Sequence, residues 1–235
     1  MSLPYFFVHD VSTNAIRLSE DSSKHMVQVL RMQEGDRLLI TNGKGTKVQA
    51  VLVDANRKGA VVQTTESVTE TAPGRQVSIA VSLLKNSSRF EWFLEKATEL
   101  GVHQIIPFFC ERTEKEKLRT DRMQGILISA MLQSQQCWLP VLQVPAPLKE
   151  IITSDPFRQK FIAHCAKGHK EQLAHQAIDP SGPVLMLIGP EGDFTTQEIE
   201  SAVANGFTPV ALGNTRLRTE TAAVVAATLL IHAAK

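Results

Sequence analysis

Two short polar segments near the C-terminal end of the chain carry residues suited to binding a small molecule. One is GPEG, residues 189–192, and the other is LGNTRLRTET, residues 212–221. Each follows an apolar run typical of a buried strand and precedes a helical pattern. Because ligands in open α/β sheets bind outside the carboxyl ends of the strands, the repeated order predicts one pocket lined by both segments. GPEG alone would indicate only a tight connection from strand to helix.

The composition of the GPEG segment indicates which ligand the pocket takes. Gly189 and Gly192 allow a ligand to approach the backbone closely, but Pro190 lacks an amide donor and Glu191 adds negative charge. Both features disfavour a phosphate. Neither GxxxxGK(S/T) nor GxGxxG occurs in the chain, so the usual signatures of nucleoside triphosphates and dinucleotides are missing. We therefore expect a nucleoside ligand without phosphates, of a kind that suits a positive centre.

The second segment leads into a helix with no polar face. Arg216 and Arg218 stand near the N-terminal end of this helix, where a positive charge opposes the helix dipole. We expect Thr219 to cap the helix and interpret Arg218 as functional, with an ion pair to Glu220 or Asp193 as the structural alternative. The following residues, AAVVAATLLIHAA, need cover on nearly all sides, and a homodimer would supply it.

Other residues that can do chemistry lie in less informative surroundings. His164 and Cys165 follow an expected strand, but no histidine or carboxylate stands at a metal-binding spacing nearby. We therefore expect no metal site and place His164 at the pocket wall. Cys110, Cys137 and Cys165 form no Cys-x-x-Cys pair, which argues against a disulfide framework and fits a reducing cytoplasm.

The rest of the sequence must position these segments. With 235 residues, 43% of them hydrophobic, the chain can form one or two domains. Short alternating segments up to about residue 70, with a helix near KHMVQVLRM between them, predict a small β barrel. Beyond ETAPGR, residues 70–75, strand and helix patterns alternate. This alternation predicts a mostly parallel sheet covered by helices on both faces.

Charge and hydropathy limit the possible partners. The net charge is +1 and the two signs are interspersed, so any contact with RNA must be local rather than spread over the chain. The N-terminus lacks the pattern of a secretory signal, and the last helix is too short and interrupted to span a bilayer. We expect a cytoplasmic protein that does not contact membranes.

Four blocks of the sequence together carry a family resemblance. KHMVQVLRMQEGD, KATELGVHQIIP, IGPEGDF and LGNTRLRTETA occur in order, and over essentially its whole length the chain resembles the ribosomal RNA small subunit methyltransferase E family. The resemblance implies an α/β protein with a PUA-like, RNA-binding β barrel (residues 1–71) and a SPOUT methyltransferase domain (residues 75–235) with a C-terminal trefoil knot. It also implies a homodimer that uses S-adenosylmethionine to methylate N3 of a specific uridine in the 16S ribosomal RNA of the small ribosomal subunit.

Carried over by position, the resemblance implies roles for individual residues. Arg218 would stabilise negative charge on the uracil ring, and Glu191 is a second expected catalytic residue, with Glu220 and His164 as other candidate bases. The residues expected to contact RNA are Lys24, His25, Arg31 and Arg89. The residues expected to bind S-adenosylmethionine are Ala163, His164, Ile188, Gly189, Pro190, Glu191, Gly192, Leu212, Gly213, Leu217, Arg218, Thr219, Glu220 and Ala222.

The chain departs from the family pattern at several positions. Asp193 stands where the family usually has a second glycine, Thr215 where it has arginine (Arg216 comes one place later), and Gln136 ends a run that usually ends in arginine. These departures bear on which arginine contacts the RNA. Two other functions stay open: a non-catalytic RNA-binding or ribosome-assembly module, and a nucleoside-dependent enzyme on an ordinary open sheet. The retained GPEG and LR segments argue against the first, and the missing phosphate motifs argue against the second.

Overall fold

The computed structural model describes residues 3–72, 74–114, 117–154 and 156–233, which divide into two compact units. The first unit contains the residues up to Ala72 together with Met131–Leu139, and the second contains the rest. Within the first unit, Lys44 forms a β-bridge with Trp138, and the Cys137 thiol donates to Glu70 at 3.0 Å. The sequence gives no local signal for this return of residues 131–139 to the first unit.

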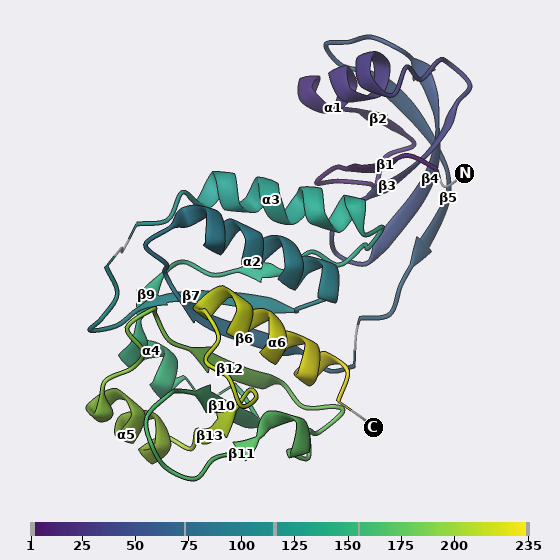
Figure 1. The fold of residues 1–235 in the computed structure, drawn as a ribbon. Coiled ribbons are helices and arrows are strands. Elements are labelled where there is room, and N and C mark those ends of the chain that lie inside the picture. The colour runs from purple at the N-terminus through teal and green to yellow at the C-terminus, as the bar shows by residue number, and fades with distance from the viewer. Residues whose placement is uncertain (1–2, 73, 115–116, 155, 234–235) are drawn as a thin grey trace. The chain divides into compact units, whose positions relative to one another are not determined.

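A five-stranded sheet forms most of the first unit (Figure 1). Its order is β1-β3-β4-β5-β2, with β1 and β3 parallel and the other neighbours antiparallel. Its core contains Leu38, Ile40 and Leu52, which are fully buried. The strands are β1 (Tyr5–Phe7), β2 (Ala15–Arg17), β3 (Arg37–Thr41), β4 (Thr46–Asp54) and β5 (Val61–Thr69).

One helical segment joins β2 to β3. It begins as α1 (Glu20–Lys24) and continues as a π-helix, η1 (His25–Val29). The Ser19 hydroxyl caps α1 by accepting from the amide of Ser22, which is the usual role of serine before a first helical turn. Met26 is fully buried in the core of the unit. The helix predicted near KHMVQVLRM therefore exists, but it begins earlier, at Glu20.

The second unit is built on an eight-stranded sheet in which every pairing between described strands is parallel. Its order is β11-β13-β10-β12-β6-β7-β8, and β9 also pairs with β7. Every residue of β6 (Val77–Ser82) and β12 (Val184–Ile188) is buried, as in parallel sheets covered on both faces. The predicted mostly parallel α/β sheet is thus confirmed. The other strands are β7 (Gln104–Phe109), β8 (Val141–Leu142), β9 (Ala146–Pro147), β10 (Gln159–Ala163), β11 (Glu171–Gln172) and β13 (Thr208–Ala211).

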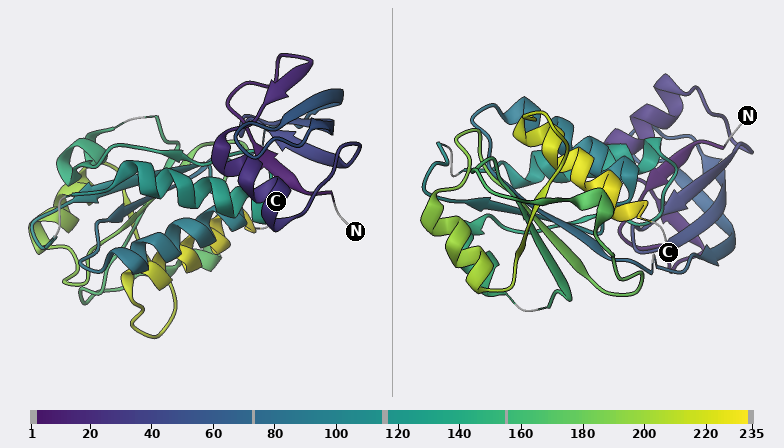
Figure 2. Two further views of the ribbon diagram at one scale, coloured as in Figure 1. Left: turned by 90° about the horizontal axis from the view of Figure 1, so that it is seen from above. Right: turned by 60° about the horizontal axis from the view of Figure 1, so that its bottom comes forward.

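Helices cover both faces of this sheet (Figure 2). On one face α2 and α6 pack against each other and α6 contacts β6 and β12, while α4 and α5 pack on the opposite face. No helix in the described ranges is long and apolar enough to cross a membrane. The helices are α2 (Ser87–Leu100), α3 (Thr120–Gln133), α4 (Leu148–Thr153), η2 (Leu173–His175), α5 (Thr196–Ala204) and α6 (Thr219–Ile231).

Candidate functional site

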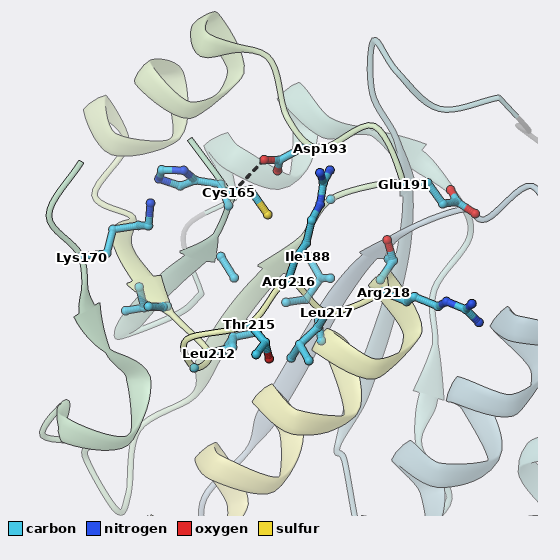
Figure 3. A pocket seen from close by; sticks show the side chains of 18 of the residues that line it. Cys165, Lys170, Ile188, Glu191, Asp193, Leu212, Thr215, Arg216, Leu217 and Arg218 are labelled. Atoms are coloured by element: carbon cyan, nitrogen blue, oxygen red, sulfur yellow. Dashed lines mark hydrogen bonds between the residues drawn. The ribbon is translucent and has the colours of Figure 1, made fainter. Parts of the chain in front are cut away.

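A cavity of about 750 Å³ lies at the carboxyl ends of three neighbouring strands of the second unit. In the sheet, Ala163 at the end of β10 is paired with Ile188 of β12 on one side and with Val210 of β13 on the other. The segments that follow these strands therefore start from one row of the sheet. Figure 3 shows their side chains around the cavity, with Lys170 at one end and Glu191 and Arg218 at the other.

The cavity brings together twelve of the fourteen residues expected to bind the cofactor. The two that do not line it are Gly192 and Glu220. It is also lined by residues that sequence reasoning did not select, among them Cys165, Lys170 and Arg216. Their only sequence signal was position, because each follows the end of a strand at the same edge of the sheet. The cofactor-binding roles themselves stay a prediction. The twelve are Ala163, His164, Ile188, Gly189, Pro190, Glu191, Leu212, Gly213, Leu217, Arg218, Thr219 and Ala222.

The GPEG segment is held from its own side by the two residues that follow it. A Cβ atom on Gly189 would lie 3.0 Å from the Phe194 ring, so a side chain at Gly189 would disturb the packing there. Phe194 in turn stacks on Phe108 of β7, with ring centroids 6.1 Å apart. Asp193 adopts a left-handed backbone conformation, with φ of 63°, and one of its carboxylate oxygens accepts from the Phe194 amide at 2.9 Å.

Two neighbouring loops hold the same segment from outside. The second carboxylate oxygen of Asp193 accepts from the Cys165 amide at 2.7 Å, across from the loop after β10. From the loop after β7, the Arg112 guanidinium donates to the carbonyl of Gly192 at 2.7 Å, and the Glu111 amide donates to Glu198 at 3.0 Å. Glu198 also completes the capping box of α5 with Thr195, as the sequence predicted. The segment is therefore fixed before any ligand binds.

The second segment meets α6 in a way that differs from the expectation. The residue that caps α6 is Arg218 and not Thr219, and no side chain caps the helix. The backbone of Arg218 is extended, so the first helical residue is Thr219, which is buried. Neither ion pair considered for Arg218 exists among the described residues, because Asp193 accepts from two amides and Glu220 faces Arg89 at 3.6 Å. The Arg218 and Arg216 side chains are exposed at the cavity.

His164 is the titratable residue of the cavity whose protonation the surroundings change. Partial burial, and then the nearby Lys170 ammonium, lowers the pKa of His164, while Asp193 acts in the opposite direction. The imidazole is therefore neutral at pH 7. Its Nδ1 atom is buried and has no hydrogen-bond partner in the described part of the chain. A buried polar atom without a partner is costly, so His164 offers a bound ligand a polar contact in the wall.

The residues expected to contact RNA lie in both units. Lys24 pairs with Glu20 at 2.8 Å across one helical turn, with both side chains about half exposed, so this pair contributes little stability. Arg31 adopts a left-handed conformation just after η1, with φ of 56°, and is exposed. His25 lies edge-on to Phe6, with ring centroids 6.2 Å apart. Within the ranges described, no three His, Cys, Asp or Glu side chains cluster closely enough to hold a metal ion.

The chain matches known families and solved structures along most of its length. Residues 71–231 match the family model of the RNA methyltransferase domain, and residues 18–65 match that of the RNA methyltransferase PUA domain. A protein of Synechocystis sp., the ribosomal RNA small subunit methyltransferase E, is 30% identical over 216 residues, which cover 90% of this chain and 71% of that protein.

Two solved structures are similar in both sequence and fold. A probable rRNA-methyltransferase from Porphyromonas gingivalis is 38% identical with a TM-score of 0.89, covering 96% of this chain and 95% of that one. The ribosomal RNA small subunit methyltransferase E from Neisseria gonorrhoeae, solved with bound S-adenosylmethionine, is 28% identical with a TM-score of 0.86. That match covers 96% of this chain and 95% of the other.

Proposed function

The chain belongs to the ribosomal RNA small subunit methyltransferase E family, and on this premise we propose that it methylates N3 of a specific uridine in the 16S ribosomal RNA of the small ribosomal subunit. Membership makes it an S-adenosylmethionine-dependent rRNA methyltransferase with a PUA-like domain. The observation that carries the proposal is the cavity formed by the GPEG and LR segments at one edge of the parallel sheet.

The properties of this cavity suit S-adenosylmethionine. The ligand carries an adenine ring, a sulfonium, an ammonium and a carboxylate, so it needs apolar walls and charges of both signs. The cavity offers Ile188, Leu212 and Leu217 as apolar wall, Lys170 and Arg218 as cations, and Glu191 and Asp193 as anions. The partnerless Nδ1 of His164 adds a polar contact. The tightly held GPEG segment supports binding with little rearrangement.

We propose a division of labour in which the protein aligns the uridine and stabilises its charge. When bound, S-adenosylmethionine supplies a methyl group already activated on a sulfonium, so little covalent catalysis is required. The Arg218 guanidinium, which forms no ion pair among the described residues, stabilises the negative charge that develops on the uracil ring as N3 loses its proton. Glu191 is a candidate for taking that proton, as are Glu220 and His164.

The remaining parts of the proposal concern RNA binding and assembly. We propose that residues 1–71 form the RNA-binding domain and residues 75–235 the SPOUT domain, with Lys24, His25, Arg31 and Arg89 contacting RNA. A trefoil knot would bring the segments after β12 and β13 to one cavity, although β10 lies between these strands. A second copy of the chain would cover the half-buried apolar side chains of α6, such as Val225 and Leu229. A cytoplasmic location is part of the same proposal.

A methyl-transfer assay tests this function. The purified protein is incubated with methyl-labelled S-adenosylmethionine and small ribosomal subunits from a strain that lacks uridine-N3 methylation of 16S rRNA. The rRNA is then digested to nucleosides and separated. We expect the label in 3-methyluridine. Cofactor binding without transfer to this RNA would contradict the proposed substrate, and absence of cofactor binding would favour a non-catalytic assembly module.

A further inference from the structure

A second, smaller cavity adjoins the N-terminal turn of α6. It measures about 300 Å³ and is lined by Ser88, Arg89 and Trp92 of α2 and by Glu220 and Thr221 of α6. The two cavities share this turn, because Thr219 lines the first and Glu220, the next residue, lines the second. A group bound in the smaller cavity therefore lies beside the wall of the proposed cofactor pocket.

Glu220 is an unusual residue at this position. Only 7% of it is exposed, yet its carboxylate makes no hydrogen bond within the described ranges. One oxygen lies 3.6 Å from Nε of Arg89, which is too long for a hydrogen bond, and the other is buried without a partner. Burying a carboxylate without hydrogen bonds is costly. The arrangement is thus incomplete, and a hydrogen-bond donor from outside would complete it.

We infer that the smaller cavity receives the uracil ring of the target uridine and that Glu220 accepts the N3 proton. This inference rests on the proposed function and deepens it. The pairing edge of uracil presents one donor, N3–H, between two carbonyl acceptors. Glu220 supplies the acceptor for N3–H, and Arg89, whose side chain is 36% exposed, supplies a donor for a neighbouring carbonyl. Rotation of the carboxylate about its terminal torsion exchanges its two oxygens, so either one can face the ring.

The neighbouring side chains fit a base that has left its stack. Trp92 is 42% exposed at the cavity, and an exposed indole is a stacking surface for an unstacked base. Cytosine presents an acceptor at N3, which would face the carboxylate unfavourably. The same pair of charged residues therefore selects uracil. Glu220 is also better held than Glu191, which is exposed on its loop.

The proposed step conserves atoms and charge. N3 gives its proton to a carboxylate oxygen of Glu220, and the electron pair left on N3 forms the new bond to the methyl carbon. The carbon–sulfur bond breaks, its electron pair stays on sulfur, and the sulfonium becomes a neutral thioether. Arg89 and Arg218 lie where they can stabilise the negative charge that passes through the ring. The proton then leaves Glu220 for solvent.

Glu220→Gln tests the inference, because glutamine keeps the size of the side chain and removes its basicity. In the labelled-methyl assay with small ribosomal subunits we expect kcat to fall by about a hundredfold or more. The dissociation constant for S-adenosylmethionine and the native mass are expected to stay unchanged. The residual rate should rise with pH, as uridine ionises without help. Glu200→Gln, on the exposed side of α5, is the matched control and should retain full activity.

A second variant tests the cavity if Glu220→Gln does not fold. Trp92→Leu removes an exposed ring, and we expect it to raise KM for the subunits about tenfold with the cofactor dissociation constant unchanged. Wild-type turnover by Glu220→Gln would overturn the inference. So would a loss that accompanies a change of native mass, because a partner subunit would then complete Glu220. If the wild-type protein forms no 3-methyluridine, the proposed function itself fails, which this comparison of variants distinguishes.

Discussion

Substitutions at Asp193 should give an order of stability opposite to that of most exposed positions. The residue has a φ of 63°, and its two carboxylate oxygens accept from the amides of Cys165 and Phe194 at 2.7 and 2.9 Å. Alanine usually destabilises a site less than glycine does, because glycine has more conformational freedom to lose. In the left-handed region this preference reverses, since only glycine adopts it without steric cost.

The expected size of the effect follows from the two hydrogen bonds and the backbone. Each bond contributes about 1 kcal/mol at a partly exposed site, so Asp193→Ala loses about 2 kcal/mol. Asp193→Gly loses the same bonds but regains about 1 kcal/mol from the relieved backbone, for a net loss of about 1 kcal/mol. Asp193→Asn keeps one acceptor oxygen and also loses about 1 kcal/mol. For a unit of this size, 1 kcal/mol lowers the melting temperature by about 2–4 °C.

Calorimetry of the three variants beside the wild type measures this order. We expect the alanine variant to melt about 4–8 °C lower and the glycine and asparagine variants about 2–4 °C lower. Titration with S-adenosylmethionine should show the weakest binding for the alanine variant, because its GPEG segment is the least fixed. If alanine were tolerated as well as glycine, the tie from Asp193 to the two amides would not be holding the segment.

Three further predictions concern the same cavity. Arg112→Met removes the donor to the carbonyl of Gly192 and should weaken S-adenosylmethionine binding by about tenfold with little loss of thermal stability; titration calorimetry measures this, and the exposed Arg57→Met is the matched control. Arg218→Lys should lower kcat by about a hundredfold while the dissociation constant for S-adenosylmethionine changes little, and an equal kcat would contradict its charge-stabilising role. Cys165 is exposed at the cavity, so alkylation followed by mass spectrometry should find it modified first and protected by S-adenosylmethionine; modification at the same rate with the ligand present would place the ligand elsewhere.

Burial explains why a second thiol should remain unmodified in that experiment. Desolvation, followed by the hydrogen bond that it donates to Glu70, raises the pKa of the Cys137 thiol to about 12. Only the thiolate reacts, so Cys137 stays inert at pH 8 in the folded protein. Its alkylation therefore reports unfolding of the first unit and serves as an internal control for the protection of Cys165.

The sequence predicts those features that depend on local pattern. Uninterrupted apolar runs such as Val184–Ile188 predict buried parallel strands, and Thr195 with Glu198 predicts the capping box that the structure contains. Because the carboxyl ends of parallel strands lie at one edge, these local patterns also place the GPEG and LR segments together.

Features that depend on distant contacts do not follow from local pattern. The bonds from Arg112 to Gly192 and from Asp193 to Cys165 join residues 80 and 28 positions apart. Likewise, the Arg89–Glu220 pair depends on how α2 packs against α6. The cap of α6 was placed one residue too late, because the extended backbone of Arg218 is set by the loop before it rather than by its side chain.

Reverse transcription of the modified rRNA tests the central claim most directly. A methyl group at N3 of uridine blocks base pairing, so the enzyme that copies the RNA stops beside the modified residue. Small subunits that lack the modification are treated with the protein, with and without S-adenosylmethionine, and the 16S rRNA is then copied. The account predicts one new stop, at a single uridine, that requires S-adenosylmethionine. Methyl transfer to this rRNA without such a stop, or a stop at another base, would contradict it.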